Sequence, residues 1–119
     1  MAIRGVGIDM VSVSRIEELV RGWDRKFLDR VFTRSELDYC LSRSRQYEHL
    51  AGRFAAKEAV IKAIGGKIPW KSIQIDSSQR GKPFVSIDAG NNNFDAKGDI
   101  HLSITHVEDY ALSLVLIED

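Results

Sequence analysis

Residues 48–66 read EHLAGRFAAKEAVIKAIGG, and this stretch is the clearest helix in the chain. Leu50, Phe54, Ile61 and Ile64 fall on one face at helical spacing. The Gly-Gly pair at 65–66 is typical of a helix C-terminus, because glycine adopts the left-handed conformation that ends a helix. The pattern therefore predicts a helix over 48–64 with one apolar face.

Upstream of this helix, the pattern predicts one strand and three short helices. Residues 3–9, IRGVGID, read as a strand loosened by glycines. Ser14 and Glu17 form a capping box that predicts a helix ending near Gly22, and 24–32 is a second helical stretch. Thr33 and Glu36 form another capping box and open a third helix.

Downstream, the pattern switches to strands. Residues 72–77 and 84–88 flank the turn RGKP at 80–83, and a polar loop with three asparagines at 91–93 follows. Residues 100–106 and 110–118 make a second hairpin around 107–109. Residues 110–117 are apolar on both faces, which predicts a central strand.

The order of these elements predicts the fold class. Strand, helices and then strands indicate an α+β fold in which helices pack on one side of an antiparallel sheet. Helices and strands do not alternate, which disfavours a doubly wound α/β fold. The length of 119 residues fits one domain over 1–119.

The composition is that of a soluble globular protein, with 44% hydrophobic and 29% charged residues. No apolar run approaches the roughly 20 residues of a membrane helix, and the N-terminus lacks the pattern of a signal peptide. Cys40 is the single cysteine, so no intrachain disulfide can form. We expect a cytoplasmic protein in which Cys40 is a buried helix residue rather than a nucleophile.

The net charge of zero hides a split along the chain. Residues 12–71 carry 13 Lys and Arg against 8 Asp and Glu, a net charge of +5, whereas 72–119 carry 3 against 8, a net charge of −5. A basic middle segment suits an anionic ligand or an acidic partner. It is equally compatible with a solvated surface that has no partner.

Two carboxylates are candidate site residues. Asp9 ends a glycine-containing strand, where another group can approach closely. Glu58 borders the apolar arc of the long helix, with Lys62 one turn later on the same side. Asp9 is also compatible with a turn or cap residue, and Glu58 with a plain Glu–Lys helix pair. We expect the small residues 51 and 55 on that strip to leave room for a ligand.

The sequence leaves the roles of Lys57 and His106 open. Lys57 falls inside the apolar arc, so it either extends its ammonium to the surface or reaches a ligand. His101 and His106 are five residues apart in a strand and must point to opposite faces, so they cannot pair on one metal. His106 ends its strand, where it is either structural or part of a site. No P-loop, dinucleotide-binding glycine motif, Cys-x-x-Cys motif or nucleophile elbow is present.

At these residues the sequence resembles the holo-acyl-carrier-protein synthases, a branch of the 4′-phosphopantetheinyl transferases. Three blocks carry the resemblance: GID at 7–9 leading to Arg15-Ile16, RFAAKEA at 53–59 with Lys62-Ala63, and SITH at 103–106. TRSE at 33–36 and GKP at 81–83 also look like the family, whereas 89–99 has no counterpart. The resemblance implies the 4′-phosphopantetheinyl transferase fold.

The resemblance also implies an activity: transfer of phosphopantetheine from coenzyme A to a serine of apo-acyl carrier protein, in support of fatty acid biosynthesis. Asp9 and Glu58 would hold Mg²⁺, which takes one or two carboxylates plus phosphate and water. Lys62 would neutralise phosphate charge, and a metal-bound water, Glu58 or His106 would take the serine proton. The residues implied in binding coenzyme A are Arg53, Lys62, Thr105 and His106, and those in catalysis are Glu58, Lys62 and His106.

Longer relatives contain two fused copies of the domain, with the carboxylates on one copy and the histidine on the other. The resemblance therefore implies a homotrimer with sites between subunits. Longer relatives also have a third acidic residue where this chain has Val11, so we expect water at that coordination position. The partner would be an acidic acyl carrier protein, bound through the basic residues Arg15, Arg21, Arg25, Lys26 and Arg30.

Two rival functions use the same residues. A nucleic-acid-binding module would use the basic helices, but the zero net charge and the lack of a recognition-helix or aromatic-platform signature argue against it. A metal-dependent hydrolase of nucleotide diphosphates would use Asp9 and Glu58 in much the same way. We expect no binding to nucleic acid or membrane.

Overall fold

The computed structural model describes residues 2–23, 25–88 and 98–119. The predicted polar loop with asparagines at 91–93 lies outside the described residues. The elements in chain order are β1 (Ile3–Ser12), α1 (Val13–Trp23), α2 (Arg25–Val31), α3 (Arg34–Leu41), α4 (Gln46–Ile64), the 3₁₀ helix η1 (Trp70–Ser72), β2 (Ile73–Ser77), β3 (Pro83–Ile87), β4 (Asp99–Val107) and β5 (Tyr110–Glu118).

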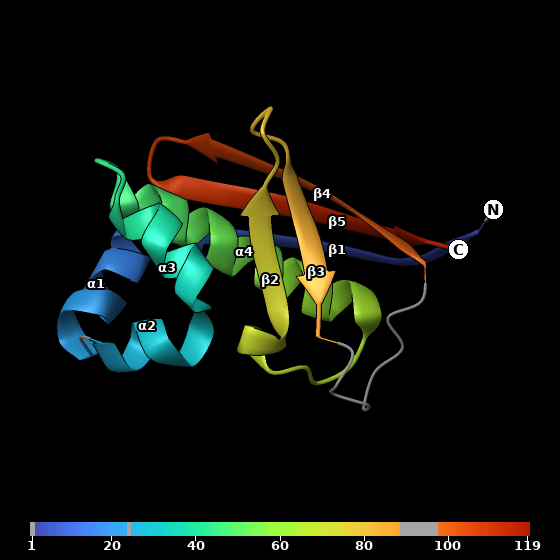
Figure 1. Ribbon diagram of the computed structural model, residues 1–119, viewed down its shortest axis with the longest axis horizontal. Helices are drawn as coiled ribbons and strands as arrows, with labels where there is room; N and C mark the ends of the chain where they lie inside the picture. The colour runs from blue at the N-terminus through green and yellow to red at the C-terminus, as the bar shows by residue number, and fades with distance from the viewer. Residues whose placement is uncertain (1, 24, 89–97) are drawn as a thin grey trace.

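The strands form two antiparallel sheets rather than the single sheet of the sequence prediction. The larger has the order β1-β5-β4, and the smaller is the hairpin β2-β3. β5 is the central strand, as its two apolar faces predicted, because both neighbours pair along its length. In Figure 1, α4 lies along one face of the larger sheet, and α1, α2 and α3 gather at one end of the molecule, opposite the termini. The α+β prediction with helices on one side is confirmed.

Helix α4 packs unusually close to β1 because that strand carries glycines. A Cβ atom at Gly7 would overlap the carbonyl oxygen of Ala59, and one at Gly5 would overlap that of Ala63. The glycines that looked like weak strand formers in the sequence therefore admit the helix backbone. This close approach brings the end of β1, with Asp9, against the side of α4.

Two hydrophobic clusters lie at the two ends of α4. One joins α4 to both sheets and includes Val60, Ile73 and Val115, all fully buried. The other joins α4 to the short helices and includes Ile16 and Leu50. Cys40 is also buried in the second cluster, as expected, and burial raises the pKa of its thiol to about 12. A thiol with this pKa stays protonated and is a poor nucleophile.

The two predicted capping boxes have different outcomes. Thr33 and Glu36 form the reciprocal hydrogen bonds of a capping box at the start of α3, as predicted. The box at Ser14 is wrong, because α1 already begins at Val13. Instead, Oγ of Ser12 accepts from the backbone N–H of Arg15 at 3.2 Å, and the Asp109 carboxylate accepts from the N–H of Ser14 at 3.0 Å.

The end of α4 is as predicted, with Gly65 in the left-handed conformation at φ 84°. Among the residues that the structure describes, no helix is long and apolar enough to cross a membrane.

Candidate active site

Asp9 and Lys62 meet where β1 crosses α4. Nζ of Lys62 donates to Oδ1 of Asp9 at 3.1 Å and to the carbonyl oxygen of Ile8 at 3.0 Å. The Asp9 side chain is only 16% exposed, whereas that of Lys62 is 54% exposed. Glu58 precedes Lys62 by one helical turn, so it lies on the same side of α4. The structure therefore places the predicted lysine in contact with Asp9 and one helical turn from Glu58.

Trp70 holds the Glu58 carboxylate in place. Its indole N–H donates to Oε1 of Glu58 at 2.6 Å, a short charge-assisted hydrogen bond. Sequence reasoning missed Trp70, since only the chain reversal after Gly65 returns residue 70 to the side of α4. Lys62 contacts Oδ1 of Asp9 and Trp70 contacts Oε1 of Glu58, so each carboxylate keeps a second oxygen for a cation.

The open space beside Glu58 is not where the sequence placed it. Ala51 and Ala55 are fully buried in the core, so the prediction that they leave room for a ligand is wrong. The space lies instead against the chain that follows α4. There, a cavity of about 700 Å³ is lined by Arg30, Glu58, Ile61, Gly66, Lys67, Ile68, Pro69, Trp70 and Lys71.

Lys57 belongs to the core and not to the site. Its side chain is fully buried, and Nζ lies 2.8 Å from Oε1 of the equally buried Glu36. Nζ also donates to the carbonyl oxygens of Trp70 at 2.9 Å and Ile73 at 2.6 Å. Burial lowers the pKa of Lys57, and the Glu36 carboxylate opposes that shift. Lys57 thus fixes the backbone of Trp70, whose indole contacts Glu58.

Arg53 and His106 lie on the other side of α4. Nη2 of Arg53 donates to Oγ of Ser77 at 3.3 Å, and its guanidinium stacks on Tyr39 with Cζ 4.1 Å from the ring centroid. Nε2 of His106 donates to the carbonyl oxygen of Glu48 at 3.1 Å. Arg53 therefore faces the small sheet, and His106, on the edge strand β4, faces the first turn of α4.

Thr105 lies on the opposite face of β4 from His106, since side chains alternate along a strand. His101 shares that outer face, where Nε2 lies 2.8 Å from Oε1 of Glu118. His101 and His106 thus lie on opposite faces of β4, as predicted.

The geometry divides the predicted site residues into two groups within one chain. Asp9 is on β1 and His106 is on β4, and β5 pairs with both strands and separates them. Strands in a sheet are about 4.8 Å apart, so the two edges are about 10 Å apart. Helix α4 covers the inner face between the edges. A single chain therefore does not place His106 beside the Asp9, Glu58 and Lys62 group.

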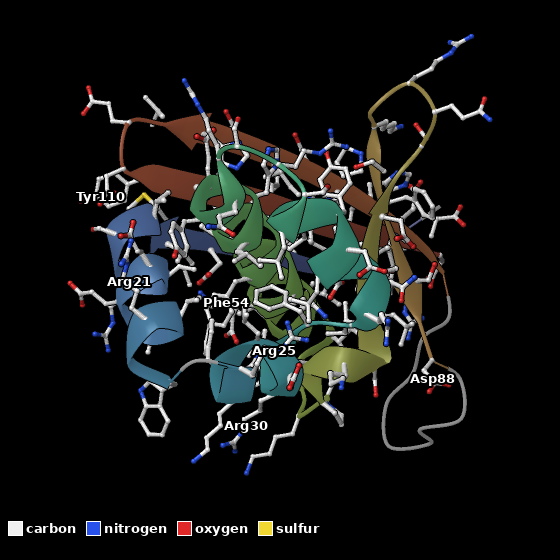
Figure 2. The ribbon with its side chains drawn as sticks, turned by 60° about the vertical axis from the view of Figure 1, so that its left-hand side comes forward. Arg21, Arg25, Arg30, Phe54, Asp88 and Tyr110 are labelled. Carbon is white, nitrogen blue, oxygen red and sulfur yellow. The ribbon has the colours of Figure 1, made fainter. Side chains whose placement is uncertain are left out.

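The basic residues of α1 and α2 are largely paired within their own helices. Arg21 contacts Glu17 at 2.8 Å, and Arg25 contacts Asp29 at 3.2 Å. Arg15 makes a similar pair with Glu18 at 3.3 Å. Figure 2 shows Arg21 and Arg30 extending outward from the two helices, away from the sheet. Exposed pairs of this kind contribute little to stability and leave the arginines free to exchange partners.

The donor chemistry of the Asp9 group suits Mg²⁺, which prefers oxygen ligands and needs few from protein. Over the residues that the structure describes, no group of three or more His, Cys, Asp or Glu side chains could hold a metal ion. A cation at Asp9 and Glu58 would therefore complete its shell with phosphate and water oxygens.

Comparison with known proteins finds a matching family model and similar curated proteins. A family model for the 4′-phosphopantetheinyl transferase superfamily matches residues 5–115. The chain is 42% identical over 123 residues to the holo-[acyl-carrier-protein] synthase of Halothermothrix orenii, with 98% of each chain covered.

Two solved structures show the same fold. One is the holo-(acyl-carrier-protein) synthase of Bacillus anthracis in complex with CoA (3′,5′-ADP), with a TM-score of 0.83 at 34% identity, covering 98% of this chain and 96% of that one. The other is the holo-[acyl-carrier-protein] synthase of Helicobacter pylori in complex with coenzyme A, with a TM-score of 0.79 at 30% identity, covering 95% and 99%.

Proposed function

This chain belongs to the 4′-phosphopantetheinyl transferase superfamily, and from that membership we propose that it is a holo-acyl-carrier-protein synthase. It transfers 4′-phosphopantetheine from coenzyme A to a serine of an apo-acyl carrier protein, releases 3′,5′-ADP and so supports fatty acid biosynthesis. The observation that carries the proposal is the contact of Lys62 with Asp9, one turn of α4 from Glu58, which lines a basic cavity. Relatives of the chain are named for this activity.

Asp9 and Glu58 would hold Mg²⁺ through the oxygens that Lys62 and Trp70 leave open. When bound, the ion would neutralise the charge of the coenzyme A diphosphate and orient it. Lys62 contributes a further positive charge from a side chain that is 54% exposed. Lys67, Lys71 and Arg30 add positive charge around the cavity, which suits the phosphates of a nucleotide.

The reaction is a phosphoryl transfer that depends mainly on positioning and charge neutralisation. The serine oxygen of the carrier forms a bond to the phosphorus nearest the pantetheine, and the bond from that phosphorus to the oxygen of 3′,5′-ADP breaks. The serine proton passes to a base, for which Glu58, His106 and a water are the candidates. 3′,5′-ADP carries the displaced charge away.

The site is completed by a second subunit in this proposal. Arg53 and His106 are on the far side of α4 from Asp9, so they would serve a neighbouring chain's carboxylates, with Thr105 near the same edge. The outer face of the sheet offers a contact surface, since Val6, Ile8, Met10 and Leu114 are 57%, 54%, 61% and 42% exposed. Large exposed apolar patches mark protein interfaces. A homotrimer would bury this face.

The acidic carrier would approach along α1 and α2, where Arg15, Arg21 and Arg25 can exchange their intrahelical partners for carboxylates of the carrier. Lys26 and Arg30 are exposed on the same helix, α2. We place the reaction in the cytoplasm, where the single Cys40 stays a thiol.

One assay tests the proposal against its rivals. The protein is incubated with coenzyme A, Mg²⁺ and an apo carrier, and the carrier is weighed by mass spectrometry. A gain of one phosphopantetheine, lost on omission of Mg²⁺, supports the transferase. Release of nucleotide without a heavier carrier would instead support the hydrolase. If the carrier gains no mass and no nucleotide is released, only a binding role is left.

A further inference from the structure

The indole of Trp70 engages one of the two oxygens of the Glu58 carboxylate. Its N–H donates to Oε1 at 2.6 Å, shorter than the usual N–H···O distance of about 2.9 Å. Oε2 is the oxygen that this hydrogen bond leaves for a cation. Cations differ in whether they bind a carboxylate through one oxygen or through both, so the contact with Trp70 bears on which cation Glu58 accepts.

Trp70 is itself held from two sides. Nζ of Lys57 donates to the carbonyl oxygen of Trp70 at 2.9 Å, and that Nζ pairs with the buried Glu36 carboxylate at 2.8 Å. The second oxygen of Glu36 accepts from the N–H of Ile75 at 2.7 Å, which ties the start of β2 to the same ion pair. The ring of Phe54 lies 6.1 Å from the indole. The core therefore fixes the backbone of Trp70, and with it the origin of the N–H that reaches Glu58.

Mg²⁺ and Ca²⁺ make different demands on a carboxylate. Ca²⁺ takes more oxygen ligands than Mg²⁺ and often binds a carboxylate through both oxygens, whereas Mg²⁺ keeps several waters and needs few protein ligands. In this chain Oε1 of Glu58 accepts from Trp70, and Oδ1 of Asp9 accepts from Lys62 at 3.1 Å. Each carboxylate thus has a donor on one oxygen, an arrangement that suits a cation bound through single oxygens.

We propose that Trp70 is a positioning residue that sets the cation preference of the site. By donating to Oε1, it orients Glu58 as a one-oxygen ligand and so favours Mg²⁺ over Ca²⁺. The indole N–H competes with Ca²⁺ for Oε1, whereas Mg²⁺ needs only Oε2. Groups that hydrogen-bond to a ligating carboxylate commonly tune a metal site in this way. The inference rests on the proposed function, in which Glu58 binds the cation.

The same hydrogen bond would also serve a purely structural role, since a partly buried indole N–H needs an acceptor. The two roles have different consequences for the cations. If the bond serves only the packing of Trp70, its loss changes the affinities for Mg²⁺ and Ca²⁺ equally or leaves both unchanged. If it orients Glu58, its loss weakens Mg²⁺ and frees Oε1 for Ca²⁺. The ratio of the two affinities therefore separates the roles.

The experiment removes the N–H and keeps the shape of the side chain. Trp23 and Trp70 are the only tryptophans, so in a Trp23→Phe background a tryptophan isostere enters at position 70 alone. The isostere is benzothienylalanine, in which sulfur replaces the N–H group. Electron paramagnetic resonance measures Mn²⁺ bound in the presence of coenzyme A, and competition gives the affinities for Mg²⁺ and Ca²⁺. A blank with coenzyme A and no protein corrects for metal bound to the free ligand.

The isostere should lower the Mg²⁺ affinity about tenfold, the lower end of the loss typical for such a partner of a metal ligand. The Ca²⁺ affinity should stay the same or rise, so the preference for Mg²⁺ over Ca²⁺ should fall about tenfold or more. Trp70→Phe should shift the ratio in the same direction. Trp23→Phe, at a position on α1 that is 61% exposed, should match the parent. Circular dichroism and light scattering check that each protein folds and assembles as the parent does.

Two results would overturn the inference. Unchanged affinities for both cations would show that the hydrogen bond does not act on the site, and an equal loss for both would assign it to the packing of Trp70. Failure of the proposed function is distinguishable from either result. In that case the parent protein would add no mass to an apo carrier, whereas failure of the inference alone leaves that mass gain intact.

Discussion

Two inactive variants should restore activity to each other if the site is shared between subunits. Within one chain, β5 and α4 separate His106 from Asp9, Glu58 and Lys62, so one subunit would supply the carboxylates and another the histidine. Glu58→Gln and His106→Ala should each abolish most transfer. A mixture of the two contains interfaces in which Glu58 comes from one variant and His106 from the other.

The size of the rescue follows from random mixing. In an equimolar mixture, an interface receives an intact Glu58 half of the time and an intact His106 half of the time. About a quarter of the interfaces should therefore be complete in a closed ring with head-to-tail contacts. The rate of carrier modification, measured by mass spectrometry after co-refolding, should reach about a quarter of the parent rate, while either variant refolded alone stays inactive.

A control mixture shows whether activity returns only when the two variants damage different halves of the site. Asp9→Ala and Glu58→Gln both damage the half of the site that one chain contributes, so their mixture should stay inactive. The reasoning is refuted if the Glu58→Gln and His106→Ala mixture is as inactive as its parents, if the control mixture recovers equally, or if light scattering finds an active monomer.

Three further predictions concern stability and partner binding. Lys57→Met should lower the free energy of unfolding, measured in urea, by about 3–5 kcal/mol because it leaves the buried Glu36 carboxylate without its cation. The double variant with Glu36→Gln should lose less stability, and equal losses in the two variants would contradict the pairing. Arg25→Glu should raise the carrier KM about fivefold, on the order of 1 kcal/mol, at low salt and less at high salt, without changing the coenzyme A KM; a carrier KM equal to that of the parent would argue against this face. Hydrogen bonds from the Ser14 and Ser12 side chains lower the pKa of Asp109 below 3.8, so its contribution to stability is present above that pH and is lost as pH falls. Asp109→Ala should thus lower the urea midpoint at neutral pH, and the difference from the parent should shrink below pH 3.8; a constant difference would contradict the assignment.

The sequence was sufficient wherever the deciding contacts are local. The capping box of Thr33 and Glu36 spans four residues, and the helix end at Gly65 needs only one residue in the left-handed conformation. The central position of β5 followed from apolar residues on both of its faces. The α+β class followed from element order, and the motifs pointed to Asp9, which contacts Lys62, and to Glu58, one turn of α4 away from that lysine.

Errors arose where a residue's partner is far away in the chain. Ser14 looks like a helix cap in its local context, but Asp109 reaches it across 95 residues and the helix begins earlier. The small side chains at 51 and 55 were expected to leave room for a ligand, because helical spacing alone does not show which side of a helix other segments pack against. Both are fully buried.

The site itself depends on tertiary structure for the same reason. The sequence left Lys57 undecided because a lysine on an apolar face is resolved only by what lies opposite, and Glu36 with two carbonyl oxygens lies there. It gave no sign that Trp70 would contact Glu58, since that contact depends on how the chain turns back after α4. The types of residue that do chemistry can be read from the sequence. Which of them share a cavity, and which are divided by a strand and a helix, is decided by packing between segments far apart in the chain.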